Sequence, residues 1–201
     1  MTVHGLLLAA GAGSRMGQPK ALVRDDDGLP WLVRSATVLL DGGCAEVTVV
    51  LGASADEAER LLADADLDLT RVHVTRSLAW QAGMGASLRA GLRALADTQT
   101  DAALVHLVDL PDVSADVVRR VLAAEAGPGA LARASYDGTP GHPVLLGREH
   151  WVKVADAASG DRGARLFLSV NDPVLVECGD LASGVDVDEP VGPTTDQRPA
   201  Q

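Results

Sequence analysis

The sequence contains few aromatic residues, few cysteines and no long apolar run. Only 2% of its 201 residues are aromatic although 47% are hydrophobic, so the core has to be built from small aliphatic side chains, which suits helices packed closely on a sheet. Its two cysteines, Cys44 and Cys178, match neither a C-x-x-C motif nor a disulfide framework, which predicts reduced thiols and a cytoplasmic location. The apolar run at residues 5–10 is much shorter than a membrane span and has no basic segment before it, so we expect no membrane partner.

Clustered positive charge is also lacking. A formal net charge of −11 would repel the phosphate backbone of a nucleic acid, so we expect no nucleic-acid partner. The length suits one well-buried domain and is short for two. We therefore predict a single domain over residues 1–190 and a flexible tail over residues 191–201, where Pro, Gly, Thr and Gln show no apolar period.

Strand patterns and helix patterns alternate along the chain. Residues 3–10 form a continuous apolar run, as expected of an inner strand covered on both faces. Ser114 is expected to cap a helix. Beyond Gly127 short strands follow one another, which predicts that the sheet becomes mixed there. The predicted fold is α/β, with one mostly parallel, mixed sheet flanked by helices. Further strands are expected at residues 46–51, 71–75, 102–108, 130–135, 142–146 and 174–177, and helices at residues 31–40, 55–65, 86–96, 115–124, from 148 onward and at 164–168.

A glycine-rich loop follows the first predicted strand. It reads AAGAGSRMGQPK over residues 9–20, and its backbone N–H groups can converge on phosphate oxygens while Arg15 and Lys20 add positive charge. The dinucleotide fingerprint would need its third glycine one position earlier, and a P-loop would need glycine directly before lysine. The second predicted strand does not end in an acidic residue that could bind the ribose of a dinucleotide. A dehydrogenase is therefore the least favoured interpretation. The residues expected to bind a nucleotide here are Ala9, Ala10, Gly11, Gly13, Ser14, Arg15 and Lys20.

This loop resembles the signature of the nucleotidyltransferases that include the molybdenum cofactor cytidylyltransferases and guanylyltransferases. The segments at residues 83–92, 108–111, 141–144 and 160–165 resemble later motifs of the cytidylyltransferase branch, in the same order. The resemblance implies a Rossmann-like nucleotidyltransferase fold with its site at the carboxyl ends of the strands. It also implies CTP as the nucleotide, because Ala-Ala-Gly at the start of the loop is typical of the cytidylyl branch.

Transfer of a nucleotidyl group needs fixed cations and a metal ion more than a strong base, because negative charge builds up on the phosphoryl oxygens and on pyrophosphate. Arg15 and Lys20 are the candidate catalytic cations. Asp109 ends a buried strand, where an oxygen ligand suits Mg²⁺, and is the principal candidate for both catalysis and metal binding. Asp186 and Asp188 resemble the acidic pair of the family and are further candidate ligands, although Glu189 replaces the usual threonine beside them.

Two further groups of residues are expected to select the substrates. Gly85 and Ser87 lie in a turn that opens a helix, and a backbone group and a small hydroxyl there could bind the edge of a pyrimidine. His142 and Arg165 are expected to position an anionic acceptor without transferring a proton, since a phosphate acceptor is already ionised. The cluster at residues 161–165 adds to this expectation.

The favoured hypothesis is a Mg²⁺-dependent transfer of CMP from CTP to molybdenum cofactor (molybdopterin), with release of pyrophosphate. A molybdoenzyme or its chaperone is a further candidate partner. A second hypothesis keeps the nucleotidyl transfer and replaces the acceptor by a sugar phosphate or another small phosphorylated metabolite. A third is a non-catalytic module that binds a nucleotide or cofactor, which the altered segment after Asp188 would permit.

Overall fold

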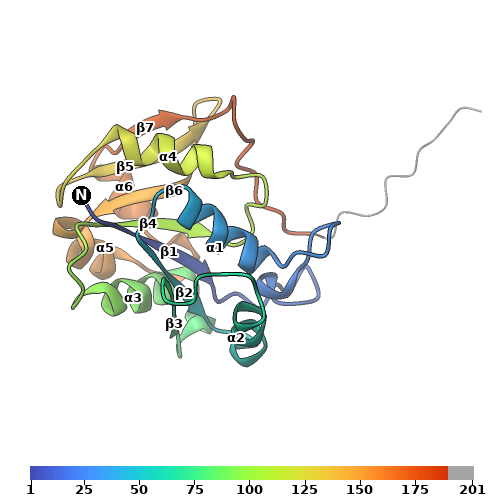
Figure 1. Ribbon diagram of the computed structural model, residues 1–201. Helices are drawn as coiled ribbons and strands as arrows, with labels where there is room; N and C mark the ends of the chain where they lie inside the picture. The colour runs from blue at the N-terminus through green and yellow to red at the C-terminus, as the bar shows by residue number, and fades with distance from the viewer. Residues whose placement is uncertain (190–201) are drawn as a thin grey trace, which may run out of the picture.

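The apolar run near the N-terminus forms β1 (Val3–Ala9), an inner strand whose seven residues are all buried. It belongs to a seven-stranded sheet in a computed structural model that describes residues 1–189. The strands follow the order β3-β2-β1-β4-β6-β5-β7, which runs from the bottom to the top of Figure 1. The other strands are β2 (Glu46–Leu51), β3 (Val72–Arg76), β4 (Ala102–Leu107), β5 (Leu131–Tyr136), β6 (Thr139–Gly147) and β7 (Val174–Glu177).

The sheet is mostly parallel, as predicted. The first four strands pair in parallel, β6 is antiparallel to both β4 and β5, and β7 is parallel to β5. Successive strands move outward from β1 to β2 and β3, and the chain then returns to place β4 on the other side of β1. Such a reversal of strand order opens a crevice at the carboxyl ends of the two strands involved, where α/β proteins bind their ligands. The ends of β1 and β4 are therefore where a site is expected.

Helices cover both faces of the sheet. The apolar residues of α1 and α4 pack in one core layer with Leu7 and Leu104, whereas those of α3 and α5 pack in a second layer with Leu6 and Leu146. Gly91 allows α3 to approach the sheet closely, because a Cβ atom there would lie 2.5 Å from Leu6 Cδ1. The helices are α1 (Trp31–Asp41), α2 (Ala55–Ala63), α3 (Met84–Leu95), α4 (Ala115–Ala124), α5 (Trp151–Ala157) and α6 (Arg165–Val170), and they can be followed in Figure 1.

The predicted strands and helices are all present, with ends that differ by a few residues. One local expectation was wrong: Ser114 occupies the N-cap position of α4, but its side chain makes no capping hydrogen bond. The short 3-10 helices at Lys20–Leu22, Trp80–Ala82 and Gly160–Arg162 carry no apolar period and were not predicted. None of the helices described is both long and apolar enough to cross a bilayer. The tail predicted at residues 191–201 lies outside the described residues.

Candidate functional site

The glycine-rich loop leaves the carboxyl end of β1 and ends in the 3-10 helix at Lys20–Leu22. Gly13 has a φ of +59°, and any side chain there would collide with the carbonyl oxygen of Gln18, so this turn requires glycine. The loop forms one side of a cavity of about 340 Å³, which we call the first cavity. The predicted nucleotide-binding residues that line it are Ala9, Ala10, Gly11, Gly13, Lys20 and Ser87.

The opposite side of the first cavity comes from the segment that leads into α3. Trp80, Gln81 and Met84 line it beside Ser87, whose side chain is buried. Gly85 is not part of the lining. A Cβ atom at this position would lie 2.7 Å from Ser159 N, so the lack of a side chain at Gly85 lets the start of α3 pack against the segment that follows α5. Ser14 and Arg15 also lie outside the lining, and their roles stay predictions.

Three carboxylates gather where β4 ends. Asp109 follows β4, and one oxygen from each of Asp109, Asp186 and Asp188 lies within 4.8 Å of the others. The Oδ1 atom of Asp109 is buried and has no hydrogen-bond partner among residues 1–189. A buried carboxylate oxygen normally has a partner, and three hard oxygen donors suit Mg²⁺ or Mn²⁺. These residues therefore fit a divalent metal ion, and both C-terminal aspartates reach the site.

The two cations of the glycine-rich loop contact the same carboxylates. Lys20 Nζ donates to Asp109 Oδ2 at 2.7 Å and to Asp188 Oδ1 at 2.5 Å, and Arg15 Nη1 donates to Asp188 Oδ2 at 2.8 Å. Burial alone would lower the pKa of Lys20, but its bonds to the two aspartates outweigh burial and raise it. The same lysine, with help from Arg15, lowers the pKa of Asp188. The site thus joins fixed positive and negative charges from three distant parts of the chain.

The segment that carries Asp186 and Asp188 is held by the turn after β4. The Val187 N–H donates to the Asp109 carbonyl oxygen at 3.0 Å. Asp112 Oδ2 accepts bonds from Ser183 N at 2.7 Å, Ser183 Oγ at 2.6 Å and Gly184 N at 3.2 Å. Asp112 thereby positions the segment without being part of the carboxylate cluster.

We predict that Asp112→Ala weakens divalent-metal binding about tenfold, because losing these charge-assisted bonds frees the segment that supplies two of the three carboxylates. Titration with Mn²⁺ followed by electron paramagnetic resonance measures the change. Asp116→Ala is the matched control: it removes the same charge from the start of α4, where Asp116 pairs with Arg119 and does not touch the segment. Equal metal affinity in both variants would contradict this positioning role.

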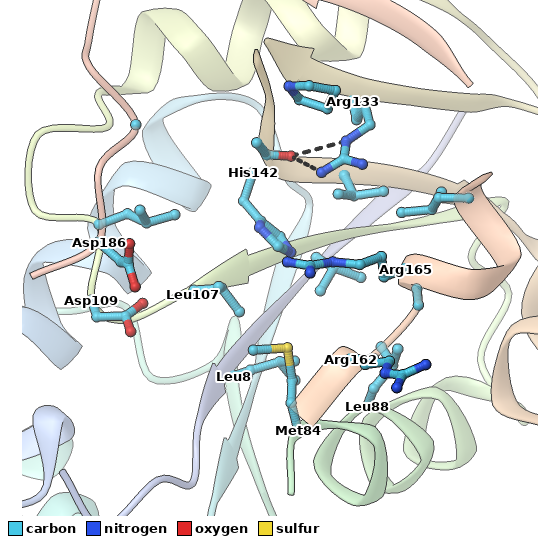
Figure 2. A pocket seen from close by; sticks show the side chains of 18 of the residues that line it. Leu8, Met84, Leu88, Leu107, Asp109, Arg133, His142, Arg162, Arg165 and Asp186 are labelled. Carbon is cyan, nitrogen blue, oxygen red and sulfur yellow. Dashed lines mark hydrogen bonds between the residues drawn. The ribbon is translucent and has the colours of Figure 1, made fainter. Parts of the chain in front are cut away.

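A second cavity, of about 390 Å³, continues from Asp109 along the other side of the site. Figure 2 shows His142 at its centre with Arg165 beside it, and both predicted acceptor-binding residues line it. Burial, followed by the charges of His106, Arg133 and Arg165, lowers the pKa of His142 to about 3. The imidazole is therefore neutral at neutral pH and can orient a ligand by hydrogen bonding.

Sequence reasoning overlooked several residues of the site. Arg133 lines the second cavity from β5, and the signal that would have revealed it is a single charge in an apolar strand. Trp80 and Gln81 line the first cavity from a short 3-10 helix that leaves no periodic pattern. Asp112 resembles an ordinary turn residue in sequence, and only its bonds to Ser183 show what it does.

Comparisons with known proteins agree with this fold. A family model described as MobA-like NTP transferase domain matches residues 5–174. Nicotine blue oxidoreductase from Paenarthrobacter nicotinovorans is 39% identical, and the match covers 92% of this chain and 92% of that one. A nucleotidyl transferase from Methanothermobacter thermautotroptrophicus has a TM-score of 0.74 at 23% identity, covering 94% of this chain and 92% of that one. Rv0371C from Mycobacterium tuberculosis H37Rv, in complex with manganese, has a TM-score of 0.68 at 25% identity, covering 93% and 94%.

The family assignment depends on the sequence matches, since the structural similarity at 23% identity establishes only the fold. The family model covers most of the chain, from β1 to the start of β7, and so includes the glycine-rich loop and Asp109. By this match and by its 39% identity to a relative of which 92% is covered, the chain belongs to the family of MobA-like NTP transferase domains, which are nucleotidyltransferases.

Proposed function

We propose that this chain transfers CMP from CTP to the terminal phosphate of molybdenum cofactor (molybdopterin) and releases pyrophosphate. One observation carries the proposal: the two cavities adjoin, and Asp109 of the carboxylate cluster lines both, as do Leu8, Met84, Leu107 and Asp161. A nucleotide in the first cavity and an acceptor in the second would bring their phosphates together at the carboxylate cluster. The product would pass to a molybdoenzyme or its chaperone.

The residues of the loop and the cluster would act by binding and charge stabilisation. The backbone N–H groups of the loop and the charges of Arg15 and Lys20 would hold the triphosphate and stabilise the departing pyrophosphate. An acceptor phosphate oxygen attacks the α-phosphorus, and the bond from that phosphorus to the bridging oxygen breaks. Asp109, Asp186 and Asp188 would hold Mg²⁺, which supplies charge stabilisation to the phosphates when bound. Neutral His142 would orient the acceptor.

The choice of CTP rests on the Ala9-Ala10-Gly11 sequence and on Ser87. Both alanines line the first cavity, and the buried Ser87 lines the same cavity from α3. A small hydroxyl and backbone groups suit the edge of a pyrimidine. A sugar phosphate or another phosphorylated metabolite is the alternative acceptor to test.

The decisive experiment measures pyrophosphate release from CTP, GTP, ATP and UTP with Mg²⁺, in the presence and absence of molybdenum cofactor, and identifies the product by mass spectrometry. We expect release with CTP plus cofactor only, with formation of the cytidine dinucleotide of the cofactor. Pyrophosphate release with a sugar phosphate but not with molybdenum cofactor would identify a sugar phosphate as the acceptor. Tight CTP binding without release for any acceptor would indicate a non-catalytic module.

The name of one relative suggests a second candidate. At 39% identity, Nicotine blue oxidoreductase is named for a redox reaction, which family membership does not itself imply. The same preparation should therefore be mixed with nicotine blue and NADH or NADPH, and the absorbance of the dye followed. Reduction of the dye without pyrophosphate release in the first assay would favour this candidate over nucleotidyl transfer.

A further inference from the structure

Three arginines gather in the part of the second cavity remote from Asp109. Arg133 comes from β5, Arg162 from the 3-10 helix before α6, and Arg165 from α6 itself. Figure 2 shows Arg162 and Arg165 at one side of the cavity and Asp109 and Asp186 at the other. Within residues 1–189, no carboxylate lies within ion-pair distance of any of the three arginines.

These three arginines place positive charge around one cavity of an acidic protein. The chain has 28 Asp and Glu residues against 17 Lys and Arg, yet only six of the Lys and Arg side chains among residues 1–189 pair with a carboxylate. Like charges that line one cavity without an ion-pair partner repel each other, and an anion from outside would relieve that repulsion. Among the described residues, the Lys and Arg side chains with carboxylate partners are Arg15, Lys20, Arg34, Arg76, Arg119 and Arg120.

Arg133 is fixed in place and part-buried. Its Nε and Nη2 atoms donate to the Gly141 carbonyl oxygen at 3.2 and 3.0 Å, as the dashed lines in Figure 2 show. Burial and the charge of Arg165 lower the pKa of the Arg133 guanidinium, so the two cations influence each other across the cavity. A guanidinium anchored in this way is preorganised for an anion, because little side-chain freedom is left to lose on binding.

Apolar side chains separate the arginines from the carboxylate cluster. They come from β1, α3, β4 and β6, and a ring or hydrocarbon body would cover them. We propose that the acceptor carries a second anionic group, which Arg133, Arg162 and Arg165 bind, at the far end of an apolar body from the group that attacks the nucleotide. Calling this ligand the acceptor rests on the proposed function, whereas the anion site does not. The apolar lining includes Leu8, Met84, Leu88, Leu107, Val144 and Leu146.

The test compares two probes that share a ring system and differ in charge. The dissociation constants of 2-naphthoate and 2-naphthamide are measured by calorimetry on the full chain, without nucleotide or metal. We expect naphthoate to bind about tenfold more tightly, because only the carboxylate can accept charge-assisted bonds from the arginines. The His142 ring protons should shift in NMR spectra on naphthoate addition, which places the probe in the second cavity.

Variants decide whether the arginines cause this preference. The double variant Arg133→Met and Arg165→Met should bind naphthoate and naphthamide equally. Arg162→Gln changes an exposed side chain, so it should reduce the preference for naphthoate without a risk to folding. Arg93→Met on the outer face of α3 is the control and should leave it unchanged. Equal affinity for the two probes in the wild type, or a preference that survives in the arginine variants, would overturn the proposal. The binding test contains no nucleotide and so does not depend on nucleotidyl transfer. If the wild type prefers naphthoate but releases no pyrophosphate in the assay of the proposed function, only the proposed function is refuted.

Discussion

Asp109→Asn is expected to abolish metal-dependent turnover, with a loss of about a thousandfold or more. Asp109 is the member of the carboxylate cluster that lines both cavities, and its buried Oδ1 atom has no hydrogen-bond partner in the described chain. Asparagine keeps the shape of the side chain but removes the charge that would attract a divalent ion. Pyrophosphate release and Mn²⁺ binding should therefore fall together.

The control for Asp109→Asn is Asp66→Asn, which removes one negative charge from an exposed position that lines neither cavity and is not part of the carboxylate cluster. Circular dichroism should show that both variants fold. A folded Asp109→Asn variant that kept wild-type turnover would remove Asp109 from the catalytic site. Loss of turnover with unchanged Mn²⁺ affinity would leave Asp109 in catalysis and shift metal binding to Asp186 and Asp188.

The fold was largely predictable because the order of strands and helices follows from local patterns. The buried β1 and the almost entirely buried β4 have mostly apolar sequences, and a chain that alternates strand and helix forms a parallel sheet with right-handed crossovers. The position of β6 between β4 and β5 was not predictable, since no local pattern records which strands pair over long distances. The sequence indicated only that the sheet becomes mixed beyond Gly127.

The site was predictable where a motif marks the end of a strand. The glycine-rich loop and Asp109 each follow a buried parallel strand, so they had to meet at one edge of the sheet. Arg133 was missed because its role depends on the pairing of β5 with β6, which brings it beside Gly141 and into the second cavity. Asp112 was missed because its partners lie 71 and 72 residues later in the chain.

The ion pairs of Lys20 suggest that it has two opposing effects. Its ammonium group contacts Asp109 and Asp188 together, and only 16% of the side chain is exposed, so this charge is poorly screened by water. A cation in that position offsets the repulsion between the carboxylates and lowers their attraction for a metal ion. The same cation is well placed to stabilise the charge of a triphosphate bound by the glycine-rich loop.

Lys20→Met is therefore expected to change turnover and metal affinity in opposite directions. Turnover should fall about a hundredfold, because a fixed charge that stabilises the transition state is lost. Mn²⁺ affinity without nucleotide should rise several-fold, by about 1 kcal/mol, since the competing ammonium is gone. Pyrophosphate release and Mn²⁺ titration measure the two effects, and Lys20→Arg, which keeps the charge, is the matched control. Unchanged turnover would exclude Lys20 from catalysis, whereas unchanged metal affinity would show that its ammonium group does not compete with the metal.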